Sequence, residues 1–333
     1  MRVAIVGTGK VAENNYLPYL VRHEDVELSY YNRSHDKAVA MADRFGGQAC
    51  ASPTELMETD PDTVLQLTHE SDRLQATRAI LPFKPRRIFF EKPLVAQRGQ
   101  ADVIEEDFFQ ARDLLQSAHR AGAETAMVFN YRFFDQTRRA REIVAERKFG
   151  EPIHFTGLVH YACWSHCIDL VLHFMGPAHT ITALAAQQAG PCMGADDVRN
   201  VTIAAKMVND ATGTLIGTCG IDFKLPLYEL TFAYEHGRIR MRDLDGEMEV
   251  IDYRSGLHQT HSLPWDLSRW DQYRASFEKS IDAYLDSVRA GTAPPVPGMA
   301  GLQELQFEAG MKRSIASGAP VILENDFPLA DLV

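Results

Sequence analysis

Apolar and polar residues alternate along the first 130 residues in the order expected of an α/β domain. Short apolar runs typical of buried strands, such as 2–7 (RVAIVG) and 63–68 (TVLQLT), are separated by stretches with helical spacing, such as Ala12–His23. The other segments predicted here are strands at 26–32, 87–91 and 125–130 and helices at 36–45, 72–81 and 102–120. This alternation predicts a parallel sheet with helices on both faces.

The pattern changes beyond Gly122, which is well placed to end a helix. One more helix is predicted at Asp135–Lys148, and a final one follows the connector 293–298 and ends at Gly318. Between them lie runs rich in β-branched and aromatic residues, at 153–161, 200–208, 213–221, 228–234, 238–241 and 247–253. Their short connections predict a sheet that is antiparallel or mixed. We therefore predict an α/β protein with a doubly wound Rossmann domain over residues 1–123 and an α+β domain with a large, mostly antiparallel open sheet over residues 124–333.

Composition excludes several classes of function. The 333 residues are 45% hydrophobic and 24% charged, which is ordinary for a globular protein. The formal net charge of −11, with acids and bases interspersed, predicts binding to neither nucleic acid nor membrane. Five cysteines, an odd number without a secretory signal, predict reduced thiols and a cytoplasmic location.

Gly7, Gly9 and Ala12 form a GxGxxA motif directly after the first strand, which is the context required of a dinucleotide-binding fingerprint. The first glycine permits a tight turn and the second lets the backbone approach a pyrophosphate, while the alanine allows close packing of helix on strand. The residues expected to line the cofactor are Gly7, Thr8, Gly9, Lys10, Val11, Asn32, Arg33, Ser34, Leu67, Thr68, Glu91 and Lys92.

The end of the second predicted strand bears on the choice of cofactor. A site for NAD usually has an acid there to bind the ribose hydroxyls, whereas this chain has Asn32, Arg33 and Ser34. Arg33 with Ser34 could hold a 2′-phosphate, which favours NADP, although an arginine that stacks on adenine accepts either NADP or NAD.

Further polar residues follow two other strands. Thr68 and His69 end one of them, and Glu91 and Lys92 end the next, on the edge of the sheet where ligands bind in open α/β folds. Lys92 is therefore a candidate to position a substrate oxygen.

The segment 160–176 (HYACWSHCIDLVLHFMG) carries a polar stripe on an apolar helix. His166, Asp169 and His173 share one side of this helix. We favour His166 as a general acid or base that Asp169 orients, and we expect His173, Cys163 and Cys167 to pack in the core. Zinc is the less favoured alternative because ligand-spaced cysteine pairs are missing elsewhere, so no metal is expected.

Taken together, the fingerprint at 7–12, EKP at 91–93, the FNYRF motif that begins at Phe129 and HCIDLVLHFMG at 166–176 resemble the glucose–fructose oxidoreductase, inositol dehydrogenase and rhizopine-catabolism family (Gfo/Idh/MocA). The resemblance implies an N-terminal Rossmann domain and a C-terminal domain that binds a sugar or cyclitol and builds homodimers or homotetramers.

The resemblance also assigns roles to residues. Lys92 reaches the substrate oxygen beside the nicotinamide, His166 relays a proton with Asp169, and Tyr131 and Arg132 line the substrate pocket together with His166. The family motif has an acid where this chain has Ala162. Either His166 acts alone, or Tyr161 supplies a phenol as proton donor, or the site is degenerate.

These observations predict an NAD(P)-dependent dehydrogenase or reductase that transfers a hydride between nicotinamide and a carbinol or ketone of a sugar, cyclitol or related polyol. Two alternatives stay open. One is a non-catalytic sensor that binds a dinucleotide and a sugar, and the other is a redox-cycling glycosidase with tightly held NAD.

Overall fold

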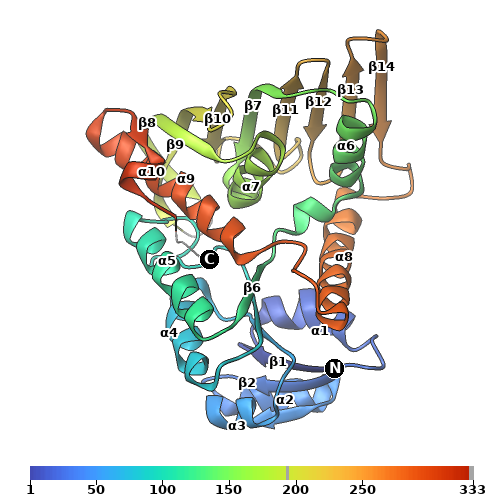
Figure 1. Cartoon of the computed structure of the whole chain (residues 1–333), viewed down its shortest axis with the longest axis vertical. Helices are drawn as coiled ribbons and strands as arrows, with labels where there is room; N and C mark the ends of the chain where they lie inside the picture. The colour runs from blue at the N-terminus through green and yellow to red at the C-terminus, as the bar shows by residue number, and fades with distance from the viewer. Residues whose placement is uncertain (193–194, 330–333) are drawn as a thin grey trace.

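The computed structural model describes residues 1–192 and 195–329, which form two sheets with helices around them (Figure 1). The first sheet has six parallel strands in the order β3-β2-β1-β4-β5-β6. Its strands are β1 (Arg2–Val6), β2 (Glu27–Tyr31), β3 (Gln48–Cys50), β4 (Thr63–Gln66), β5 (Arg87–Phe90) and β6 (Glu124–Met127). The strand order reverses between β1 and β4, and a crevice for a ligand is expected there.

Helices cover both faces of this sheet. They are α1 (Leu17–Leu20), α2 (His35–Phe45), α3 (Pro53–Glu58), α4 (Glu70–Ile80) and α5 (Glu105–Arg120). The first predicted helix is divided, because Ala12–Tyr16 forms a π-helical turn before α1. Pro18 lacks an N–H and therefore cannot extend a regular ladder of hydrogen bonds into this turn.

The second sheet has nine strands in the order β14-β13-β12-β11-β7-β10-β9-β8-β15. Its strands are β7 (Pro152–His160), β8 (Ala178–Cys192), β9 (Ala195–Met207), β10 (Thr212–Thr218), β11 (Tyr228–Tyr234), β12 (Gly237–Arg242), β13 (Glu247–Asp252), β14 (Leu257–Ser262) and β15 (Val321–Ile322). Only β7 and β10 pair in parallel among these strands as the structure describes them.

The remaining helices are α6 (Asp135–Glu146), α7 (Trp164–Met175), α8 (Arg269–Ala290), α9 (Gly298–Ser317) and α10 (Leu323–Asp326). Of these, α7 and α9 pack on one face of the nine-stranded sheet, against β7 and β8 respectively. Helix α7 is almost entirely buried because it lies between this sheet and α9.

Helix α8 returns the chain to the first domain. Phe277, Ile281 and Tyr284 of α8 pack with Val3 and Ile5 of β1 in one buried cluster. The cores of the two domains are thus built from segments far apart in the sequence.

The predicted α/β fold class is confirmed, with a parallel sheet first and a mostly antiparallel sheet second. The boundary at residue 123 stays a prediction, but β6 begins at Glu124 and pairs with β5, so the first sheet continues past it. The apolar spacing gave no expectation for α8 or β8. No helix in the described part of the chain is long and apolar enough to cross a membrane.

Candidate active site

The turn after β1 packs its backbone directly against the end of β4. Gly7 has φ +95°, and a Cβ there would lie 2.6 Å from the backbone nitrogen of Thr68. Only glycine meets both conditions without strain. A Cβ at Gly9, in contrast, would have no atom within 4 Å. The turn therefore leaves open the space that a pyrophosphate needs, and the residues here fit a dinucleotide.

A cavity of about 460 Å³ lies on one side of this turn, at the ends of β2 and β4. Asn32 fixes its floor, because its Oδ1 accepts from the Thr8 N–H at 3.3 Å and its Nδ2 donates to the Ser34 carbonyl at 3.1 Å. The Arg33 side chain is 88% exposed and lies 3.8 Å from Asp72. Lys37 also lines the cavity and adds a second cation, which the sequence analysis missed. Its place in the first turn of α2, one turn beyond Arg33, was the available signal.

A crevice of about 560 Å³ lies on the other side of the turn, between the two domains. Gly9, Leu67 and Thr68 line both the cavity and the crevice, so the two spaces adjoin at the glycine turn. Lys10 and Val11 line the crevice as well. The predicted cofactor residues are thus brought together around two adjoining spaces.

The loop after β5 is held by a buried arginine that the sequence analysis did not single out. Arg73 of α4 is 2% exposed and donates to the carbonyls of Thr68 at 2.8 Å, of Glu91 at 2.6 Å and of Pro93. A buried guanidinium is costly unless its donors are paired, and these carbonyls pair both terminal nitrogens of Arg73, while its Nε has no partner among the described residues. Arg73 therefore fixes the ends of β4 and β5 relative to each other.

Glu91 is a structural partner of this loop. Its carboxylate is 7% exposed and accepts from the Tyr16 hydroxyl at 2.8 Å and from the Lys92 backbone N–H at 2.8 Å. The peptide bond between Lys92 and Pro93 is cis. The Lys92 ammonium lines the crevice and donates to Oε1 of Gln100 at 2.7 Å. Glu91 and Lys92 therefore have different roles: the buried carboxylate holds the loop, and the ammonium faces the crevice.

The C-terminal domain gives this crevice an apolar wall. Tyr131, Ala162 and Cys163 lie on it, and the Tyr131 hydroxyl donates to the Cys163 sulfur at 3.3 Å. Other lining residues of this wall are Phe223, Leu227, Leu244, Trp270, Tyr273 and Phe277. The sequence analysis missed these six, because they come from loops and from α8 rather than from a motif.

His166 lies behind this wall rather than on it. Its ring stacks on Tyr131 with centroids 4.1 Å apart, and its Nδ1 has no hydrogen-bond partner among the described residues. Burial, together with the Lys92 charge, lowers the pKa of His166 well below its usual value. The imidazole is therefore neutral at neutral pH and can accept a proton.

Asp169 is bound to Arg132. The two side chains form a bidentate ion pair, with Nε to Oδ2 at 2.8 Å and Nη2 to Oδ1 at 2.6 Å. Both carboxylate oxygens of Asp169 are therefore occupied by Arg132, and the structure gives them no contact with His166. Arg132 is not among the crevice-lining residues, and Tyr161 points its hydroxyl to the Arg199 carbonyl at 2.6 Å.

Comparison with known proteins shows which family the first domain resembles. The family model described as "Oxidoreductase family, NAD-binding Rossmann fold" (Gfo/Idh/MocA) matches residues 1–123. The match covers the Rossmann domain and no residue beyond 123. The D-glucoside 3-dehydrogenase of Escherichia coli (strain K12) is 27% identical over 159 residues, which are 45% of this chain and 41% of that relative. The chain thus matches less than half of the length of this relative.

Solved structures resemble the whole chain in fold. An oxidoreductase from Agrobacterium radiobacter, in complex with NAD+, L-tartaric acid and magnesium, has a TM-score of 0.80 at 15% identity, with 98% of this chain and 99% of that chain covered. The WlbA dehydrogenase from Bordetella pertussis, in complex with NADH and UDP-GlcNAcA, has a TM-score of 0.74 at 18% identity, with 97% of each chain covered. At these identities the likeness concerns the fold alone.

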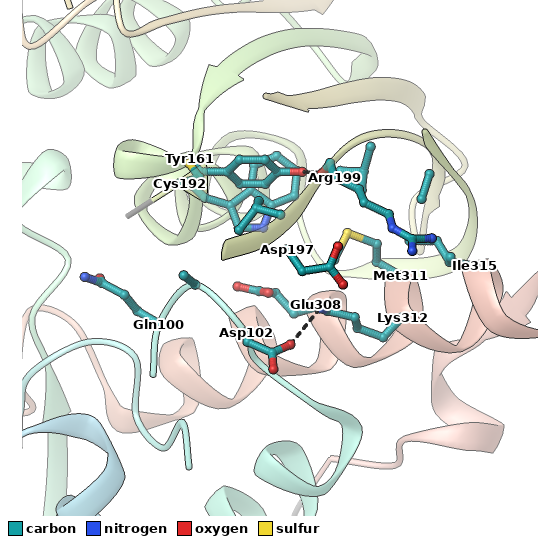
Figure 2. A pocket seen from close by; sticks show the side chains of 15 residues that line it. Gln100, Asp102, Tyr161, Cys192, Asp197, Arg199, Glu308, Met311, Lys312 and Ile315 are labelled. Atoms are coloured by element: carbon teal, nitrogen blue, oxygen red, sulfur yellow. Dashed lines mark hydrogen bonds and ion pairs between the residues drawn. The ribbon is translucent and has the colours of Figure 1, made fainter. Parts of the chain in front are cut away.

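A second, smaller cavity of about 260 Å³ lies beside the crevice (Figure 2). Gln100 lines both spaces. Acidic side chains of Asp102, Asp197 and Glu308 face this second cavity together with Lys312, which lies 3.5 Å from Asp102. Its aromatic wall includes Trp164, which is 5% exposed.

Beneath the second cavity, α9 buries two acids one turn apart. Glu304 is 0% exposed, and neither of its oxygens has a hydrogen-bond partner among the described residues. Burial and the neighbouring Glu308 raise the pKa of Glu304 well above its usual value, against the opposing pull of Lys92. Glu304 is therefore held as the neutral acid.

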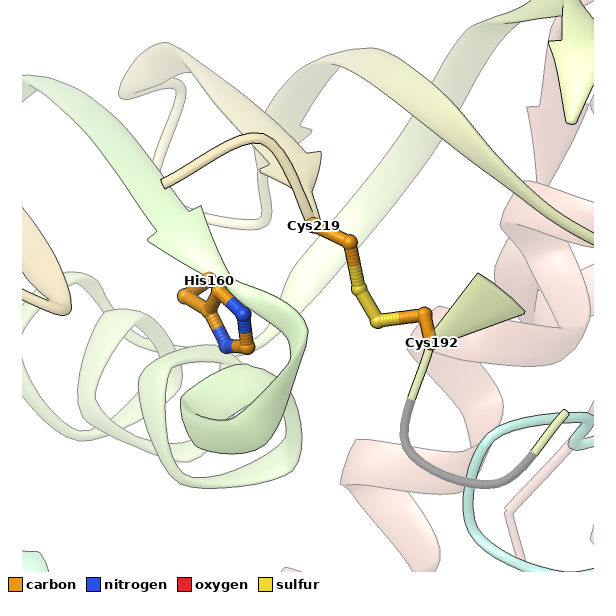
Figure 3. Close-up of side chains that lie close together, drawn as sticks. All are labelled: His160, Cys192 and Cys219. Carbon is orange, nitrogen blue, oxygen red and sulfur yellow. A yellow bond between two sulfur atoms is a disulfide. The ribbon is translucent and has the colours of Figure 1, made fainter. Parts of the chain in front are cut away.

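Two cysteines near the second cavity form a pair that the sequence analysis excluded. Cys192 ends β8, Cys219 follows β10, and the structure joins them by a disulfide with their Cα atoms 6.0 Å apart (Figure 3). The expectation of reduced thiols is wrong for this pair, because 27 residues separate the partners and no sequence spacing reports their contact. Cys50, Cys163 and Cys167 are free and buried.

His160 completes a group with these two sulfurs, since its ring nitrogen and both sulfurs lie within 4.8 Å of one another. However, the Nδ1 of His160 accepts the Ala162 N–H at 3.0 Å, so the neutral ring carries its proton on Nε2. A metal-bound histidine usually donates its second ring nitrogen to an acceptor instead. With its sulfurs bonded to each other, this group does not fit zinc.

We expect Glu304→Gln to change the pH dependence of stability. Glu304 has a raised pKa in the folded state, so as pH rises above the unfolded-state value near 4.5 the unfolded chain loses the proton first. The wild type then loses up to about 1.4 kcal/mol of stability per pH unit through this group, until the folded-state pKa is reached. Urea unfolding at several pH values between 5 and 8 should show Glu304→Gln gaining on the wild type as pH rises.

The matched control is Glu324→Gln, an exposed acid on α10. Its stability difference from the wild type should not vary with pH. A Glu304→Gln difference that is equally flat would mean that Glu304 is ionised in the folded protein.

Proposed function

We propose that this chain is an NAD(P)-dependent dehydrogenase or reductase that acts on a carbinol or ketone of a sugar, cyclitol or related polyol. The observation that carries the proposal is the place of Lys92, whose ammonium lies in the crevice next to the open face of the glycine turn. The match of the first domain to an NAD-binding oxidoreductase family supports it, as does the match to a D-glucoside 3-dehydrogenase.

In this proposal the chain provides binding, orientation and proton transfer. The nicotinamide, when bound, exchanges the hydride with the substrate carbon. Lys92 donates a hydrogen bond to the substrate oxygen and stabilises negative charge that develops there. His166 relays the proton that the oxygen releases during oxidation and returns it during reduction, from a position behind Tyr131 rather than on the crevice wall. The apolar wall that includes Tyr131 and Tyr273 excludes water from the reacting atoms.

Position 162, where the family motif has an acid, is an alanine that lines the crevice. Glu91 binds Tyr16 and the Lys92 backbone, and Asp169 binds Arg132. In the proposed reaction, proton transfer therefore depends on Lys92 and His166. Tyr161, whose hydroxyl turns away to Arg199, is not used.

Replacement of Lys92 by Ala tests the proposed chemistry. Loss of the group that holds the substrate oxygen should lower kcat/KM by about 10²–10⁴-fold. Cofactor affinity should change little, because the glycine turn and Arg73 are untouched. The measurements are fluorescence titration with NADPH and NADH, and a panel of polyols, keto-sugars and D-glucosides read at the reduced-nicotinamide absorbance.

The matched control is Lys84→Ala, an exposed lysine remote from the crevice that should keep full turnover. Wild-type turnover in Lys92→Ala would refute the assignment. Tight cofactor binding by the wild type with no turnover on any substrate would favour the sensor, whereas cofactor retained through purification with glycoside cleavage and no net oxidation would favour the redox-cycling glycosidase.

We further propose a preference for NADP over NAD, supported by Arg33, Ser34 and Lys37 around one cavity with no acid at the strand end. Arg33→Ala should weaken NADPH binding by about 10–100-fold, the range expected for hydrogen bonds to a charged phosphate. NADH binding should change by less than about threefold, because NADH lacks that phosphate. Arg78→Ala, at the far end of α4, is the control. Equal losses for both cofactors would show that Arg33 stacks on adenine.

We also propose that a second copy of the chain covers the open face of the nine-stranded sheet. Leu158, Ile216, Thr202 and Leu184 are consecutive partners across β7, β10, β9 and β8, and the three apolar members of this row are 44%, 37% and 72% exposed. Helices α7 and α9 pack on the other face.

Leu184→Lys should shift the protein from dimer or tetramer towards monomer in sedimentation velocity, because it places a charge in the row that the second copy would bury. Val208→Lys is the matched control, since Val208 is 64% exposed and lies beyond the end of β9. A monomeric wild type would contradict this assembly without affecting the proposed chemistry.

A further inference from the structure

The segment 219–227 joins β10 to β11 and forms a lip of the crevice. Its residues Phe223 and Leu227 line the crevice opposite the glycine turn and Lys92. The position of this segment therefore determines how much of the substrate space is covered.

The second half of the segment is held by Arg269, at the start of α8. Its guanidinium donates to the carbonyls of Phe223 and of Leu225, the latter at 2.9 Å, and pairs with Asp243 at 2.7 Å. Asp243 also accepts from the Leu227 N–H at 3.1 Å. These contacts fix residues 223–227 whatever the state of the cysteines.

The first half depends on the disulfide. Among the residues that the structure describes, the hydrogen bonds of 219–222 are local: the Gly220 N–H donates to Thr218, and Asp222 accepts from the N–H groups of Lys224 and Leu225. The contact that joins this half to a distant segment is the bond from Cys219 to Cys192. The Phe223 ring packs edge-on against His160 with centroids 4.7 Å apart. Cys192 in turn lines the second cavity. One covalent bond thus joins the lip of the crevice to the wall of the second cavity.

We propose that Cys192 and Cys219 are a reversible redox modification site, and that the reactant is a low-molecular-weight disulfide. Two protein thiols and R–S–S–R give the protein disulfide and two R–SH, so the protein sulfurs lose two electrons to the small disulfide and both protons leave on R–SH. Closing the bond fixes residues 219–222, the half of the lip that precedes Phe223. Opening it releases this half of the lip, while Arg269 keeps the other half in place.

Differences in burial explain why we expect this pair, and not the other three cysteines, to react. Cys219 is only partly buried, whereas its partner Cys192 and the free Cys50, Cys163 and Cys167 are buried. Cys219 is therefore the residue at which we expect the small disulfide to react first. Burial also raises the pKa of Cys163 to about 11, which leaves little thiolate to react at neutral pH. The three other cysteines therefore serve as internal controls.

The first experiment uses the full chain, treated either with glutathione disulfide or with dithiothreitol. Intact mass and peptide mapping should find the Cys192–Cys219 linkage only after oxidation, with the other three cysteines free in both samples. In hydrogen–deuterium exchange, reduction should speed exchange in 219–222 by about tenfold or more, as expected for a local opening, and leave 223–227 nearly unchanged. Neither measurement needs turnover, so failure of the proposed dehydrogenase chemistry would not affect them.

Variants complete the test. Cys192→Ser and Cys219→Ser should each show the exchange of the reduced protein under both treatments, whereas Cys50→Ser should respond as the wild type does. If the wild type turns over a substrate, oxidation should change its KM and not that of Cys219→Ser.

Three results would overturn the proposal: both cysteines free after oxidation, segment exchange that does not respond to the treatment, or stoichiometric zinc in the reduced protein that Cys219→Ser loses. The last result would assign His160, Cys192 and Cys219 to a metal.

Discussion

The hydrogen bonds of one buried guanidinium determine the geometry of the candidate site. Arg73 binds carbonyls at the ends of both β4 and β5, and these are the strand ends from which Thr68 and Lys92 enter the crevice. Each of these carbonyls would need another donor if Arg73 were absent, and the cost of a buried, unpaired polar group is about 1–3 kcal/mol. An apolar side chain of similar size would leave these carbonyls without their donor, although the Ala96 N–H and the Gln100 N–H also join the second loop to Glu70. The positions of these two strand ends in the candidate site therefore depend on hydrogen bonds made in the core.

The second constraint is the path of α8. Its residues pack on the first sheet, the Tyr284 hydroxyl lies 2.6 Å from Thr63 Oγ1, and Asn130 of the FNYRF motif donates to Ser276 at 2.7 Å. The same helix presents Trp270 and Tyr273 to the crevice and begins at Arg269, which holds the lip. One helix from the C-terminal half thus packs against the first domain and also supplies part of the aromatic wall of the crevice between the domains. A boundary drawn at a single residue cannot represent this arrangement, since the core of the first domain includes residues beyond 270.

The sequence predicted correctly those parts of the site whose residues are close together in the chain. The turn at Gly7 and Gly9, the strand ends at Thr68 and Lys92 and the polar residues after β2 could be placed from spacing alone, because neighbours in sequence remain neighbours in such turns. It was uninformative where a partner comes from afar. Asp169 was paired with His166 one turn away, yet the structure pairs it with Arg132, 37 residues earlier. The Cys192–Cys219 bond and the carbonyl partners of Arg73 are of the same kind. Helical spacing predicts which side of a helix a residue occupies. It does not predict which charged side chain of another element will pair with that residue.

The absence of an acid at position 162 has a consequence for the charges around the crevice. The site has a neutral, buried histidine, a tyrosine and a cysteine whose pKa values are raised by burial, and a lysine in contact with an uncharged glutamine. A carboxylate at position 162 would attract the lysine and divide its hydrogen bonds between protein and substrate. With alanine there, the Lys92 ammonium donates to Gln100, and the neighbouring Glu91 carboxylate is turned to Tyr16 and to the backbone. A lysine without a carboxylate partner attracts negative charge on a substrate oxygen more strongly than a paired lysine does. In the reaction proposed above, alanine at position 162 therefore alters the route of the proton and leaves the electrostatic role of Lys92 in place.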